Sequence, residues 1–62
     1  MEFELYSHFY YRGDDYIPRR ITIVGKYERP GFYWVVNGHL TKEEIEVKKP
    51  ERFLIHVNKI TT

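Results

Sequence analysis

Turn-forming residues recur about every ten positions in this chain, and their spacing limits its fold more than any other feature. The turns fall at Arg12-Gly13-Asp14-Asp15, Arg29-Pro30-Gly31, Asn37-Gly38 and Lys48-Lys49-Pro50-Glu51. Gly and Asn accept a positive φ, Pro presets the first central position of a turn, and Asp bonds its own backbone. The segments between these turns are too short for a helix that crosses over between parallel strands. We therefore expect an antiparallel sheet.

Alternation of apolar and polar residues indicates strands between the turns. The alternation covers residues 2–11, 16–28 and 52–60, whereas residues 32–38, FYWVVNG, form a strand that is apolar on both sides. Pro18 delays the regular part of the second strand to Arg19, and Gly25 predicts a bulge or bend. Asn37-Gly38 is the strongest hairpin signal of the chain, so a partner strand is expected from His39.

Residues 39–47 allow two interpretations. Thr41-Lys42-Glu43-Glu44 matches a capping box, which predicts one helical turn near residues 41–46, followed by a short strand that carries Ile45 and Val47. The expected fold is then an all-β, five-stranded antiparallel meander that curls into an SH3-like barrel. The order of its elements is similar to that of SH3-like barrels, without a family motif. The alternative is an open five-stranded sheet with the Thr41 to Glu46 segment as a helix on one face.

The composition indicates one small domain, residues 1–62, with a thin core. The chain has 62 residues, no cysteine to form a disulfide or a thiolate metal site, and a net charge of +1. Neither a cationic, apolar leader nor a membrane-length apolar run is visible, so a cytoplasmic location is expected. A charge this close to zero does not by itself point to nucleic acid.

Aromatic residues make up 18% of the chain, and the predicted core takes up only part of them. We expect the bulkier side of the 32–38 strand to face inward with apolar residues of the other strands. The predicted core residues are Phe3, Leu5, Phe9, Ile21, Ile23, Phe32, Trp34, Val36, Ile45, Phe53 and Ile55. The residues predicted to lie on the outer faces are Tyr6, Tyr10, Val24, Tyr33 and Val35, more apolar surface than a small monomer usually exposes.

The polar residues carry no recognisable catalytic or metal-binding pattern. His8, His39 and His56 lie in separate segments without the short spacings that prepare metal ligands. Ser7 has no base on its own face, and Asp14-Asp15 and Glu43-Glu44 are typical of a turn and a helix cap. We therefore expect no enzymatic activity, no metal, no cofactor and no small-molecule substrate.

The surplus of tyrosine predicts a non-catalytic interaction module that binds another protein or a second copy of the chain. A small inhibitor or accessory subunit fits this description. The predicted partner-binding residues are Tyr6, Tyr10, Tyr33, Arg19 and Arg20. Tyrosine and arginine are enriched at such interfaces, and an exposed edge strand offers a second route for pairing. The competing explanation is that the outer rings pack on Lys and Arg stems of neighbouring strands.

Nucleic-acid binding is the alternative function of a different class. Small β barrels stack bases on aromatic rings while cations follow the phosphates. The residues predicted for this function are Arg19, Arg20, Lys26, Arg29, Tyr27 and Tyr33. Asp14, Asp15 and Glu28 interrupt the same surface, which is more typical of a mixed, solvated surface.

Overall fold

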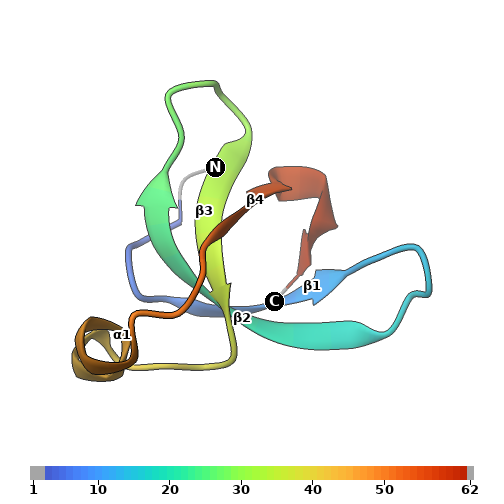
Figure 1. The fold of residues 1–62 in the computed structure, drawn as a ribbon. Helices are drawn as coiled ribbons and strands as arrows, with labels where there is room; N and C mark the ends of the chain where they lie inside the picture. The colour runs from blue at the N-terminus through green and yellow to red at the C-terminus, as the bar shows by residue number, and fades with distance from the viewer. Residues whose placement is uncertain (1–2, 62) are drawn as a thin grey trace.

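The structure is a computed structural model that describes residues 3–61, and its main element is one five-stranded antiparallel sheet (Figure 1). The strands are β1 (His8–Arg12), β2 (Pro18–Lys26), β3 (Phe32–Asn37), β4 (Phe53–His56) and β5 (Ile60–Thr61). A short helix, α1 (Lys42–Lys48), follows β3, and a 3₁₀ turn, η1 (Val57–Lys59), joins β4 to β5. The strand order is β4-β3-β2-β1-β5, so the first four strands form a meander and β5 returns beside β1. The prediction of an all-β, antiparallel fold is confirmed.

The sheet is curled but open, which differs from the expected closed barrel. The four-residue β4 and the two-residue β5 are its two borders, and no ladder joins them within residues 3–61. In this respect the structure is closer to the alternative of an open sheet with a real helix. No helix in the described part of the chain is long and apolar enough to cross a membrane.

The helix α1 forms because its two ends are capped. The Oγ1 atom of Thr41 accepts a hydrogen bond from the Glu44 amide at 3.1 Å, and a carboxylate oxygen of Glu44 accepts from the Thr41 amide at 3.0 Å. At the other end Lys49 turns left-handed, with φ 47°, and donates to the carbonyl of Ile45 at 2.9 Å. The predicted capping box is confirmed, but the helix extends through the predicted strand at Ile45 and Val47 because these caps satisfy its terminal backbone groups.

The last and first predicted strands are both shorter in the structure. The 52–60 segment divides into β4 and β5 because Nδ1 of His56 accepts a hydrogen bond from the Asn58 amide at 3.1 Å and starts η1. The 2–11 segment becomes a strand only at His8, after a turn in which Tyr6 has φ 65°. Glu2, the first residue of that prediction, lies outside the described residues.

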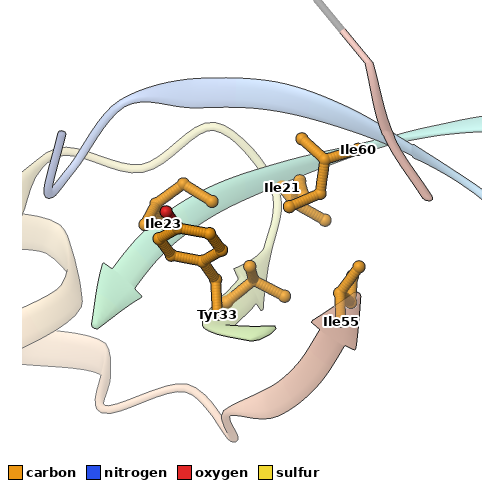
Figure 2. Packing of buried hydrophobic residues seen from close by; sticks show 6 residues of the cluster. Ile21, Ile23, Tyr33, Ile55 and Ile60 are labelled. Atoms are coloured by element: carbon orange, nitrogen blue, oxygen red, sulfur yellow. The ribbon is translucent and has the colours of Figure 1, made fainter. Parts of the chain in front are cut away.

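The core lies inside the curl of the sheet, and Figure 2 shows Tyr33 pointing toward Ile23 and Ile60 lying beside Ile21, with Ile55 on the same side as Tyr33. We call this side of the sheet the inner face and the opposite side the outer face. The buried cluster is Ile21, Ile23, Tyr33, Val35, Ile55 and Ile60, with Phe3, Phe9, Tyr11 and Phe53 packed against it. The prediction that Tyr33 and Val35 face outward is wrong, as is the burial of Leu5, which is exposed.

Strand pairing explains why β3 turns its smaller apolar side inward. Val35 lies opposite Ile23 of β2, and Tyr33 lies opposite Ile55 of β4. Directly paired residues share one face of a sheet, so two isoleucines draw this side of β3 into the core. Phe32 and Trp34 consequently lie on the outer face, half-buried. The bulge predicted at Gly25 is present as a shift of register between Ile23 and Gly25.

Candidate interaction face

The structure brings together two of the five predicted partner-binding residues, Tyr10 and Arg20, and separates the other three from them. Tyr10 on β1 lies directly opposite Arg20 on β2, and both point to the outer face. Tyr6 lies further along, where the Nζ atom of Lys42 approaches its ring centroid to 5.9 Å. Arg19 is paired with Tyr11 on the inner side of the hairpin, and Tyr33 is in the core. The predicted set is therefore not one surface.

Tyr33 is a structural residue rather than an exposed anchor. Its side chain is only 5% exposed, and its ring meets the ring of Phe3 edge to face at a centroid distance of 5.1 Å. The hydroxyl of Tyr33 accepts a hydrogen bond from the Phe3 amide at 3.4 Å. Because the ring fills the core, Tyr33 is not available to a partner in the folded protein.

Arg19 is neutralised within the β1–β2 turn. Its guanidinium donates to both carboxylate oxygens of Asp15, at 2.7 and 3.3 Å, and one of these oxygens also accepts from the Ile17 amide at 3.1 Å. The hydrogen bond from Arg19, followed by that from the Ile17 amide, lowers the pKa of Asp15, and the same carboxylate raises the pKa of Arg19. Arg19 therefore stabilises the turn.

Arg20 and Arg12 lie on the outer face and, unlike Arg19, have no carboxylate partner within residues 3–61. Arg12 lies opposite Pro18 and two residues from Tyr10, so it shares the face of Tyr10 and Arg20. Both arginines are exposed, and neither forms an ion pair with any carboxylate of the described chain. We call this surface, defined by Tyr10, Arg12 and Arg20, the Tyr10 face. Arg12 was not among the predicted site residues because the sequence pattern placed it in the turn, whereas β1 extends to Arg12 and so continues the alternation on the side of Tyr10.

Two histidines hold Tyr10 from the side. The rings of His8 and His39 stack at a centroid distance of 4.7 Å and an angle of 4°, and the Tyr10 ring meets His39 edge to face at 5.2 Å. Nε2 of His8 lies 3.0 Å from the carbonyl oxygen of Leu40, and Nε2 of His39 lies 3.0 Å from that of Phe9. Carbonyl oxygens only accept, so both histidines carry their hydrogen on Nε2. No local sequence signal indicates this pair, because its members are 31 residues apart.

The segment after β3 is fastened across the outer face by Thr22. This residue is fully buried, and its hydroxyl donates to the Gly38 carbonyl at 2.7 Å and accepts from the Leu40 amide at 3.0 Å. The segment then leads into α1, where the hydrogen bond from the Thr41 amide is the main cause that lowers the pKa of Glu44. Thr22 thus holds the backbone beside His39 in place, which separates the Tyr10 face from the rest of the outer face.

A second aromatic cluster lies on the outer face of β3 and β4. We call it the Trp34 cluster, and it contains Tyr27, Phe32, Trp34, Arg52, Leu54 and His56. Trp34 packs edge to face on Tyr27 at 5.8 Å, and the Arg52 guanidinium carbon lies 5.5 Å from the Trp34 ring centroid. Leu54 lies opposite Trp34. The rings of this cluster therefore contact one another, and the Arg52 guanidinium lies over Trp34, so this cluster satisfies much of its own aromatic surface.

The residues predicted for nucleic-acid binding do not form one surface either. Arg20 belongs to the Tyr10 face and Tyr27 to the Trp34 cluster, whereas Lys26 lies beyond the bulge opposite Tyr33. Arg29 lies in the turn before β3. With Arg19 bound to Asp15 and Tyr33 buried, no continuous track of these cations and rings is present among residues 3–61.

The ionisable residues show no arrangement that would hold a metal ion. Within residues 3–61, no three His, Cys, Asp or Glu side chains gather as a metal site requires. His56 lies apart from the other two histidines, against the ring of Phe32 at a centroid distance of 4.9 Å. The absence of catalysis and of a cofactor stays a prediction.

Comparisons with known proteins add no relative. No protein-family model matches the chain, and no curated protein or solved structure is significantly similar to it. The function therefore has to be inferred from the site.

Proposed function

We propose that this protein is a non-catalytic interaction module that binds another protein through the Tyr10 face. The observation that carries the proposal is an exposed tyrosine held by His39, next to two arginines that form no ion pair within residues 3–61. A ring that is already held in place loses little conformational freedom on binding, and Tyr and Arg are the side chains most enriched at interface centres. A small inhibitor or accessory subunit in the cytoplasm is the role that we propose for such a module.

The Tyr10 face supports a protein partner better than nucleic acid. Binding to a single strand depends on a row of cations that follows many phosphates and on several rings for stacking. This face offers one ring, which is 37% exposed, and two arginines that form no ion pair in the described part of the chain. A compact group of an aromatic residue and two arginines is typical of a protein interface.

We also propose that the curled sheet is an open form of the SH3-like architecture. The order of hairpins, helical turns and a closing strand that returns to β1 supports this assignment. The open border between β4 and β5 is the feature that departs from a closed barrel. An experimental structure in which other strands pair with β1 would overturn the assignment.

Site-specific photocrosslinking tests the proposed function. Tyr10 is replaced by p-benzoylphenylalanine in cells that make the protein, and Leu54 is replaced in a control variant. The two side chains are matched in exposure, 37% and 38%, but Leu54 belongs to the Trp34 cluster. We expect discrete protein adducts from position 10, and an adduct of twice the mass would identify a second copy as the partner.

Three outcomes of this experiment would contradict the proposal. Adducts from position 54 alone would move the interface to the Trp34 cluster. Adducts that nuclease removes would support the nucleic-acid alternative. An absence of adducts from position 10, in a variant that folds as the wild type does, would exclude a partner at the Tyr10 face.

A further inference from the structure

We propose that the partner of the Tyr10 face presents an extended acidic segment, with two carboxylates two residues apart, to Arg12 and Arg20. This inference rests on the proposed function and adds the chemistry of the partner. It follows from the position of the two arginines on the sheet, from the absence of neutralising carboxylates around them within residues 3–61 and from the ring that neighbours both of them.

The two arginines lie at a spacing that an extended segment can match. Arg20 pairs with Tyr10, and Arg12 pairs with Pro18, so the arginines are diagonal neighbours on adjacent strands. Diagonal neighbours on one face are ~7–8 Å apart. Alternate residues of an extended chain lie on one side of it and are ~6.6–6.8 Å apart, which is nearly the same distance. Two acidic side chains at positions i and i+2 therefore reach one arginine each.

No carboxylate within residues 3–61 forms an ion pair with either of these two charges. The nearest carboxylates in sequence are Asp14, which lies 4.0 Å from Nζ of Lys59, and Asp15, which binds Arg19. Glu44, in the helix α1, accepts a hydrogen bond from the Thr41 amide and forms an ion pair with Lys48 at 3.8 Å. The two arginines are diagonal neighbours of like charge, and no ion pair within residues 3–61 offsets their repulsion. Their placement is favourable only when an anionic group binds.

Tyr10 gives the site an apolar surface beside the charges. Tyr10 neighbours both arginines, because Arg20 lies directly opposite it and Arg12 lies two residues along the strand, and the edge contact with His39 orients its ring. Methylene groups of acidic side chains can pack on this ring while their carboxylates bind the guanidinium groups in bidentate geometry. Carboxylates are favoured over phosphates because the site holds two charges and not a longer row of them.

The inference is tested by titrating the full-length protein with short synthetic peptides and following backbone amide signals by NMR. The first peptide contains Glu-Val-Glu, the second contains Gln-Val-Gln, and the third contains Glu-Glu-Val in an otherwise identical frame. We expect saturable shifts at Tyr10, Arg12 and Arg20 with the first peptide. Its affinity should exceed that of the second at least tenfold and that of the third at least threefold, and added salt should weaken it.

Arginine variants separate the site from the general charge of the protein. Arg12→Ala and Arg20→Ala should each weaken binding of the Glu-Val-Glu peptide at least fivefold. Arg19→Ala is the matched control because it removes the same charge from the next residue, on the other face, and it should leave the affinity within twofold. Thermal unfolding of each variant, compared with wild type, shows that the fold is intact.

Several results would overturn the acidic-segment inference. The glutamate and glutamine peptides could bind equally, or Arg19→Ala could lose as much affinity as Arg12→Ala and Arg20→Ala. No peptide could bind at millimolar concentration, or a single-stranded oligothymidylate could bind more tightly than any peptide. If protein adducts still form at position 10 in any of these cases, the proposed function stands and only the acidic chemistry of the partner is wrong.

Discussion

Tyrosine and arginine are satisfied within the protein on the inner face of the sheet and remain accessible on part of its outer face. On the inner side Tyr33 is 5% exposed and packs on Phe3, and Arg19 is bound to Asp15. On the outer side Tyr10 is 37% exposed, and its neighbour Arg20 has no ion pair in residues 3–61. The inner side is thus complete within the protein, whereas the Tyr10 face leaves an aromatic surface and positive charge available. This difference separates residues that maintain the fold from residues that we assign to binding.

The largest expected effect that tests this comparison is the loss of the Tyr33 ring. Tyr33→Ala should lower the free energy of unfolding by about 3–5 kcal/mol, the range for large buried aromatic residues. A domain of this size has roughly 3–9 kcal/mol in total, so the variant should be partly or fully unfolded. Tyr10→Ala should cost less than about 1 kcal/mol. Chemical denaturation of both variants measures the difference, and equal losses would contradict the division between the two faces.

The next prediction concerns the buried Thr22 hydroxyl, which binds the backbone of Gly38 and Leu40 on the outer face. Thr22→Val keeps the shape of the side chain but leaves the Gly38 carbonyl and the Leu40 amide without their partner. We expect a loss of about 1–3 kcal/mol in the free energy of unfolding. Thr61→Val is the control, because its hydroxyl makes one long bond of 3.4 Å to Tyr10 near the surface, and it should change stability by less than half as much.

The capping box at the N-terminus of α1 should also contribute to the free energy of unfolding. Thr41→Ala removes the hydroxyl that accepts from the Glu44 amide and should cost about 1 kcal/mol in unfolding free energy. Glu43→Ala changes a neighbouring residue of the first turn that makes no cap bond and should have a smaller effect. Denaturation followed by circular dichroism measures both, and an equal effect would mean that the cap contributes no stability of its own.

The smallest expected effect is on the dependence of stability on pH. The pKa of Asp15 is lowered in the folded protein by Arg19 and the Ile17 amide, from an ordinary value of 3.8. The contribution of this carboxylate is therefore fully present above that value and is lost as the pH falls through the lower folded pKa. Between pH 2 and 6, the free energy of unfolding should fall less with decreasing pH for Asp15→Asn than for wild type. An equal fall in the two proteins would contradict the role of the Asp15–Arg19 pair in the turn.

Local signals in the sequence predicted the parts of the fold that depend on neighbouring residues. The capping box at Thr41 and Glu44 is present, and the register shifts at Gly25 as expected. These features involve hydrogen bonds or backbone freedom within a few residues, so short stretches of sequence contain the information. The site was predicted only in part, because Tyr10 and Arg20 lie together on the outer face whereas Tyr33 and Arg19 do not.

The sequence by itself determined the positions of the turns, the antiparallel class of the sheet and the capping box of α1, because each depends on residues that are close along the chain. The hairpin predicted at Asn37-Gly38 is wrong, because no strand starts at His39 and the next strand to pair with β3 is β4. Only the tertiary structure decided which side of β3 faces the core inside the curl, because both sides are apolar and the choice depends on Ile23 and Ile55 from other strands. It also decided that His8 and His39 stack beside Tyr10, and that Arg19 is neutralised while Arg20 is not. The physical reason is that register assigns every residue of a strand to one face, and register is set by partners that are distant in the sequence.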